Sequence, residues 1–255
     1  MQIKIDVIDA PGKNKIYHRG PPLNHGPLPS IFYFSLSGEE SLGLEPYNQP
    51  AVFLSEQGLR VFSLTLPGHE DAFPHQHAIK EWGKILTTGK NVIDEFIETC
   101  IQALDFLISQ NYVDENYIGV AGLSRGAYIA AQLAAKDERI NVILGFAPLT
   151  RLETIKGFIE LADPLLLSEH SLEKLIPDLI NKKLRFYIGN YDSLVGTQHC
   201  FSFIHALTEC AYQKNRRFPS VELNIYPSIG HKGHGTPPEI FDSGSLWLSQ
   251  ILSQK

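Results

Sequence analysis

The stretch that decides the fold is Gly122-Leu123-Ser124-Arg125-Gly126. It has the form G-x-S-x-G, with a serine flanked at two-residue spacing by glycines. A short apolar run at residues 117–122 precedes the turn and is typical of a buried strand. An alanine-rich run at residues 126–136 follows it and is typical of a helix. This strand–turn–helix setting is the context in which the motif carries chemistry.

The chemistry of such a turn explains its residue types. A serine held between a strand and a helix lies on a sharp turn, and flanking glycines remove the Cβ atoms that would clash there. The N-terminus of the following helix favours negative charge beside Ser124. The backbone N–H of Arg125 is then available to a tetrahedral oxyanion. We therefore predict that Ser124 is a nucleophile, the alternative being a tight structural turn.

Outward from this turn, strand-like and helix-like segments alternate. Apolar runs predict strands at residues 30–36, 59–66, 117–122, 141–146, 184–188 and 221–226, and an alternating pattern predicts another within residues 1–9. Apolar periodicity predicts helices at residues 91–110, 126–136, 196–213 and 241–253. This order predicts an α/β fold in which helices flank a mostly parallel central sheet. We expect residues 1–255 to form a single domain, with functional loops at the carboxyl ends of the strands.

One segment interrupts the alternation. Residues 151–182 are longer than a simple crossover, contain Pro164 and Pro177, and carry an apolar run at residues 164–167. We predict a short helical insertion that acts as a small lid before the strand at 184–188. The alternative is an ordinary long connection packed on the surface.

A serine hydroxyl is a weak nucleophile without a general base, and the base needs an orienting carboxylate. Asp192 follows the strand predicted at 184–188 by a few residues, which places its carboxylate at the same sheet edge as Ser124. Asp163 and Asp178 are rivals by residue type, but both lie in the insertion. We predict Asp192 as the acid.

Two histidines follow the last predicted strand. His231 comes four residues after Pro227 and His234 comes seven after it. The shorter reach favours His231 as the base and leaves His234 as the alternative. A paired-histidine metal site is disfavoured because no third ligand is near in sequence.

The order Ser124, Asp192, His231 resembles that of the α/β-hydrolase superfamily. Within that superfamily, the phrases Gly-Leu-Ser-Arg-Gly and Ile-Gly-Asn-Tyr-Asp, together with the lack of a large cap, look most like the dienelactone-hydrolase and prolyl-oligopeptidase-like branch. We expect no propeller, since the strands and helices already occupy nearly all 255 residues. The resemblance implies an α/β-hydrolase fold and a Ser-His-Asp triad.

The oxyanion hole departs from the pattern of that family. Such enzymes carry His-Gly after the third strand, whereas this chain has Ser37-Gly38-Glu39-Glu40-Ser41. By resemblance, the second oxyanion donor is the backbone N–H of Glu39, beside that of Arg125. This placement brings Glu39 and Glu40 near the site and leads us to expect that they disfavour anionic substrates.

Composition excludes several other classes of protein. The chain is 43% apolar and 20% charged with a net charge of −6, so it has neither the signature of a disordered protein nor a basic footprint for nucleic acid. Its three cysteines, Cys100, Cys200 and Cys210, lack the spacing of a disulfide framework or zinc site. No run is long enough for a membrane span and no leader is apparent, so we expect a cytoplasmic protein without membrane contact.

A second histidine cluster lies at residues 69–77, where His69, His75 and His77 stand beside Glu70 and Asp71. We interpret it as a solvated loop edge rather than a metal site.

These observations predict a serine hydrolase that cleaves an ester-type bond of a small molecule through an acyl-enzyme, with no cofactor. A peptidase, a thioesterase and a non-catalytic binding protein on the same fold are the alternatives. Specificity is expected to depend on Leu36, Phe73 and residues 155–167. The sequence gives no oligomeric state.

Overall fold

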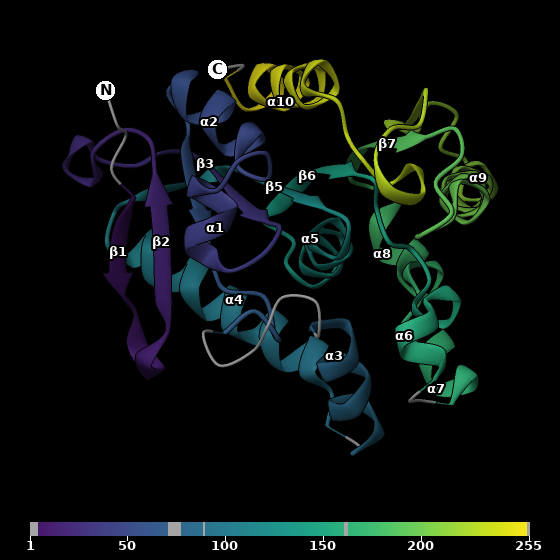
Figure 1. Cartoon of the computed structure of the whole chain (residues 1–255). Helices are drawn as coiled ribbons and strands as arrows, with labels where there is room; N and C mark the ends of the chain where they lie inside the picture. The colour runs from purple at the N-terminus through teal and green to yellow at the C-terminus, as the bar shows by residue number, and fades with distance from the viewer. Residues whose placement is uncertain (1–4, 71–77, 89, 161–162, 254–255) are drawn as a thin grey trace.

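Eight strands form one sheet, in the order β1-β2-β4-β3-β5-β6-β7-β8 (Figure 1). The structure is a computed structural model that describes residues 5–70, 78–88, 90–160 and 163–253. β1 pairs with β2 and β2 with β4 in antiparallel register, and each remaining neighbour is parallel. The α/β fold with a mostly parallel sheet is therefore confirmed.

The strands match the predicted apolar runs closely. They are β1 (Asp6–Asp9), β2 (Lys15–Arg19), β3 (Leu28–Phe34), β4 (Arg60–Ser63), β5 (Val113–Leu123), β6 (Ile140–Phe146), β7 (Lys183–Gly189) and β8 (Val221–Tyr226). Only β2 has no counterpart among the predictions. Its sequence, Lys-Ile-Tyr-His-Arg, is too polar to resemble a buried strand, yet His18 and Arg19 are buried in the structure.

Helices cover both faces of the sheet (Figure 1). Alternate residues of β3 point to opposite sides: Phe32 and Phe34 pack in one core cluster, and Ile31 and Tyr33 pack in the other. The first cluster includes residues of α3, α4, α5 and α9, and the second includes residues of α2 and α10. The helices are α1 (Gly38–Gly43), α2 (Gln49–Glu56), α3 (Ala78–Thr87), α4 (Val92–Ser109), α5 (Arg125–Lys136), α6 (Lys156–Ile159), α7 (Pro164–Glu169), α8 (Ile176–Leu179), α9 (Thr197–Gln213) and α10 (Pro238–Ser253).

The segment from 151 to 182 consists of short helices: α6, α7, α8 and two 3₁₀ turns, Leu152–Thr154 and Leu172–Leu175. It packs on the body of the protein. The ring of Phe158 lies 6.3 Å from that of Trp82, and the Tyr128 hydroxyl donates to the His170 carbonyl at 2.7 Å. The helical content was predicted correctly, while motion of this segment as a lid stays a prediction.

His18 in β2 gives the fold a pH dependence. Its side chain is 1% exposed and its ring lies 5.2 Å from that of Phe62. Burial lowers the pKa of His18 from 6.5 to about 4, although Asp6, whose Oδ2 lies 3.6 Å from Nδ1, opposes this shift. Between these two pH values the unfolded chain therefore binds more protons than the folded chain.

We expect the free energy of unfolding to fall as the pH drops from about 6.5 towards 4, by up to about 3 kcal/mol from His18 alone. The His18→Phe variant removes the titrating group and keeps an aromatic ring beside Phe62. Urea unfolding at a series of pH values should therefore show a shallower decline in this variant. If the free energy of unfolding fell with pH at the same slope in both proteins, the assignment of this pH dependence to His18 would be contradicted.

Candidate active site

Ser124 lies on a strained turn between β5 and α5. Its backbone has φ 56° and ψ −115°, a conformation that residues with side chains rarely adopt. Both flanking glycines are required by close packing. A Cβ on Gly122 would lie 2.1 Å from the carbonyl carbon of Gly126, and a Cβ on Gly126 would lie 1.8 Å from the carbonyl oxygen of Phe34. The predicted turn is thus present, with Arg125 as the first residue of α5.

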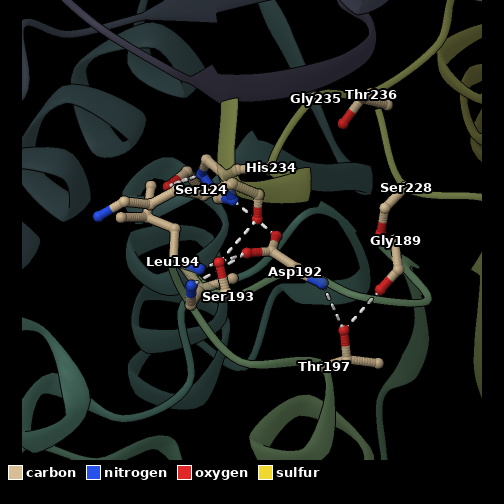
Figure 2. Close-up of polar contacts among 12 residues, drawn as sticks. Ser124, Gly189, Asp192, Ser193, Leu194, Thr197, Ser228, His234, Gly235 and Thr236 are labelled. Carbon is tan, nitrogen blue, oxygen red and sulfur yellow. Dashed lines mark hydrogen bonds and ion pairs between the residues drawn. The ribbon is translucent and has the colours of Figure 1, made fainter. Parts of the chain in front are cut away.

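Ser124, His234 and Asp192 are linked by hydrogen bonds, which Figure 2 shows as dashed lines. Ser124 Oγ lies 2.9 Å from His234 Nε2, and His234 Nδ1 lies 2.7 Å from Asp192 Oδ2. A carboxylate only accepts, so Nδ1–H donates to Asp192, and Nε2 is left to accept the serine hydroxyl proton. The arrangement is that of a nucleophile, a base and an orienting acid.

The position predicted for His231 is held by His234. The chain turns back between Ile229 and Gly235, where the Gly235 amide donates to the Ile229 carbonyl at 2.8 Å. This turn returns His234 to the end of β8 and leaves His231 exposed on the turn's 3₁₀ helix (His231–Gly233). The number of residues between the strand and each histidine therefore did not predict which histidine reaches Ser124.

Glycines fix this turn against the loop after β7. Gly230 and Gly233 have φ of 73° and 76°, and a Cβ on Gly233 would lie 2.0 Å from the Tyr191 carbonyl oxygen. The carbonyl of Lys232 accepts the Ser193 amide at 2.9 Å. These contacts hold the two loops together and so bring His234 to Asp192.

Asp192 is fixed by its own loop. Its Oδ1 accepts the amides of Leu194 at 2.9 Å and Val195 at 3.1 Å, and its side chain is fully buried. Thr197 ties the loop to β7, because its hydroxyl donates to the Gly189 carbonyl and accepts the Asp192 amide (Figure 2). Thr197 was not predicted from the sequence, where only its position at the start of a predicted helix hinted at a role.

The rival acids lie elsewhere. Asp163 caps the N-terminus of α7 by accepting the Leu165 amide at 2.7 Å, and Asp178 lies in α8. Both belong to the segment at 151–182, as the sequence indicated.

Ser124 and His234 open onto a pocket of about 410 Å³. Its other lining residues are mostly apolar or aromatic: Ser35, Leu36, Pro46, Tyr47, Leu123, Arg125, Leu194, His231, Gly235, Thr236 and Phe241. Leu36 was predicted here and is present. Residues 155–167 do not line the pocket within the described part of the chain, and Phe73 lies outside that part. Tyr47 and Phe241 were not foreseen, because they come from distant segments.

The two residues predicted as oxyanion donors line different pockets. Arg125 lines the pocket directly after the nucleophile. Glu39 instead lies in the first turn of the helix α1 and lines a neighbouring pocket of about 420 Å³ with Lys15 and Tyr17. The role predicted for its amide is therefore not supported by its position.

The loop after β3 is organised around a buried serine. The amides of Ser35 and Leu36 both donate to Ser41 Oγ, at 3.1 and 3.0 Å. Glu40 forms a capping box with Ser37 at the start of α1. Glu40 is thus engaged in holding the loop rather than in facing the Ser124 pocket.

The second histidine cluster falls partly outside the described residues, which include His69 and Glu70 but not Asp71, His75 or His77. His69 Nε2 lies 2.6 Å from Arg125 Nη2. Among the residues that the structure describes, no group of three or more histidine, cysteine or acidic side chains is placed to hold a metal ion. Within that same part of the chain, no helix is both long and apolar enough to cross a membrane.

Comparison with known proteins gives a family match that spans the site. The sequence profile of the prolyl oligopeptidase family matches residues 80–243, well over half of the chain and including Ser124, Asp192 and His234. No curated protein matches the chain.

Several solved structures share the fold. A protein described as a dipeptidyl aminopeptidase IV from Bacteroides ovatus has a TM-score of 0.72 and 18% identity over all of this chain, which spans 36% of that protein. One described as a dienelactone hydrolase from Klebsiella pneumoniae has a TM-score of 0.71 and 15% identity, with 99% and 98% of the two chains covered. A cold-adapted esterase from an Arctic intertidal metagenomic library has a TM-score of 0.66 and 20% identity, with 96% and 92% covered. These likenesses confirm the α/β-hydrolase fold.

Proposed function

The chain belongs to the prolyl oligopeptidase family, and on that premise we propose that it hydrolyses ester-type bonds of small molecules through a triad of Ser124, His234 and Asp192. One observation carries the proposal. The three side chains form a continuous hydrogen-bonded series, and its nucleophile opens onto a pocket.

The first half of the reaction forms an acyl-enzyme. Ser124 Oγ attacks the carbonyl carbon while its proton passes to His234 Nε2. The Arg125 amide, at the N-terminus of α5, donates to the oxyanion that develops. His234 then protonates the leaving oxygen as the ester C–O bond breaks.

The second half releases the acid. Water attacks the acyl carbon, its proton goes to His234, and the bond to Ser124 Oγ breaks as that oxygen regains a proton. Asp192 stays ionised throughout and stabilises the imidazolium, because its carboxylate accepts the Nδ1 proton. Two backbone amides on its other oxygen keep it oriented.

An ester substrate is favoured by the pocket. Its apolar lining, with Leu36, Leu123 and Phe241, suits the acyl chain of a small molecule. A peptidase is the second candidate, because the family profile is that of the prolyl oligopeptidases. A thioesterase shares the same acyl-enzyme chemistry. A non-catalytic binding protein is disfavoured, since it has no need of the strained serine at φ 56°.

We expect the wild-type protein to hydrolyse p-nitrophenyl esters of graded acyl length and to leave peptide p-nitroanilides almost uncleaved. Both sets release a chromophore, so the kcat/KM values are directly comparable. Faster cleavage of the anilides would favour the peptidase. Absence of turnover with both sets would contradict the proposed hydrolase function.

A further inference from the structure

The side chain of Arg125 is a partly buried cation beside the nucleophile. Its Nη2 lies 2.6 Å from His69 Nε2, and its Cζ lies 5.2 Å from the centre of the Trp82 ring. Trp82 is fully buried in α3, and its indole N–H donates to the Pro67 carbonyl. Arg125 Nη1 is buried and has no hydrogen-bond partner among the described residues.

Several other arginine head groups in the structure have acceptors. Arg60 donates to backbone carbonyls that include those of Pro21 and Gly26, and Arg139 pairs with Asp137 and Asp105. Arg185 also stacks on a tryptophan, but it pairs with Glu222 at 2.6 Å. Among the described residues, Arg125 contacts an imidazole nitrogen and an aromatic face in place of a carboxylate.

A buried charge without a counter-ion is unfavourable. Burial lowers the pKa of Arg125 to about 10, and no carboxylate among the described residues raises it. At neutral pH the guanidinium is nevertheless charged. An anionic group in the pocket, which Arg125 lines, would supply the missing counter-charge.

The sheet order shows which end of a substrate this cation would meet. His69 follows β4 and Trp82 lies in α3, while His234 follows β8, so they lie on opposite sides of the turn after β5. The leaving group departs beside His234, which protonates it. Arg125 therefore faces the acyl side.

We propose that the Arg125 side chain binds a carboxylate at the far end of the substrate's acyl chain, so that preferred substrates are monoesters of dicarboxylic acids. This inference rests on the proposed function, which it narrows. It also replaces the expectation that Glu39 and Glu40 exclude anions, because Glu39 lines the neighbouring pocket and Glu40 caps α1. The reaction is the same hydrolysis: water is added, the ester C–O bond breaks, and a dicarboxylate and an alcohol leave.

The kinetic test compares matched pairs of p-nitrophenyl esters: hydrogen succinate against butanoate, hydrogen glutarate against pentanoate, and hydrogen adipate against hexanoate. Each pair differs by a carboxylate in place of a methyl group. For the best chain length, we expect the wild type to favour the acid by about 10- to 100-fold in kcat/KM. This ratio should collapse in Arg125→Met and be partly kept in Arg125→Lys, which retains the charge.

Arg185→Met is the matched control, because it removes another tryptophan-stacked arginine away from the pocket. In Arg185→Met, the ratio of kcat/KM for the acid to kcat/KM for the matched ester should equal that of the wild type. A wild-type ratio at or below one for every length would overturn the inference while leaving the hydrolase function intact. A preference for the acid that persists in Arg125→Met would also overturn the inference. If the Arg125 side chain had a purely structural role, Arg125→Met would lower only the melting temperature.

A binding measurement is independent of turnover. In the Ser124→Ala background, calorimetry with monomethyl glutarate and methyl pentanoate should show tighter binding of the anion by about tenfold or more. Adding Arg125→Met should abolish the difference. Equal affinities for the two ligands would contradict the carboxylate subsite, whatever the fate of the hydrolase proposal.

Discussion

Replacing Ser124 with alanine is expected to lower kcat/KM for p-nitrophenyl esters by about 10⁴-fold or more. The hydroxyl that attacks the carbonyl is lost, while the pocket and the Arg125 amide remain. Only the residual catalysis of an oxyanion donor and binding should persist. Initial rates of p-nitrophenol release under matched conditions measure the effect.

The control is Ser109→Ala, which removes an exposed serine hydroxyl at the end of α4 that bonds only its own helix at the Phe106 carbonyl. Its rates should match those of the wild type. Circular dichroism should show that both variants are folded. A Ser124→Ala protein that retained wild-type rates would refute the nucleophile assignment.

Replacing His234 with alanine should have a comparably large effect, about 10⁴-fold or more on kcat. Without His234, Ser124 Oγ has no base at 2.9 Å, and Asp192 has lost the imidazole that it orients. His231→Ala should be far less harmful and act mainly on KM, because His231 lines the pocket on the exposed turn.

The two histidine variants control each other. They remove the same group from one seven-residue turn, so a general disturbance of the loop would affect both. If His231→Ala proved the inactive variant and His234→Ala the active one, the turn would have to rearrange in solution, and the base assigned from the structure would be wrong.

Much of the fold could be predicted because apolar patterning records burial directly. The strands β3 to β8 are continuous apolar runs or alternating patterns bounded by turn residues, and the long helices α4, α5, α9 and α10 have clear periodicity. β2 was not predicted because the residues that it buries include the polar His18 and Arg19. Arg19 donates to the Leu42 carbonyl, which is 23 residues away in sequence, and no local pattern shows such a partner.

Ser124 and Asp192 could be predicted as candidate site residues because each lies close to the end of a well-defined strand. His234 was only the alternative, because its place depends on a turn with three left-handed residues, Gly230, Lys232 and Gly233. Glycines at 230 and 233 hinted at such a turn, whereas Lys232 gave no sign of positive φ.

The place of Glu39 could not be predicted for a related reason. The resemblance assigned a role to the residue after Gly38, but the capping box of Ser37 and Glu40 begins α1 at that point and carries Glu39 to another pocket. The lack of an acidic partner for the Arg125 guanidinium among the described residues could not be predicted either, since it becomes visible only once the chain is folded.

The proposed reaction depends most directly on Ser124 being a nucleophile activated by His234. A fluorophosphonate reacts covalently with such a serine, and mass spectrometry of the digested protein locates the adduct. We predict one adduct, on the peptide that contains Ser124, in the wild type and in His231→Ala, and none in Ser124→Ala or His234→Ala. An adduct on another residue, or labelling that survives in Ser124→Ala, would contradict the account.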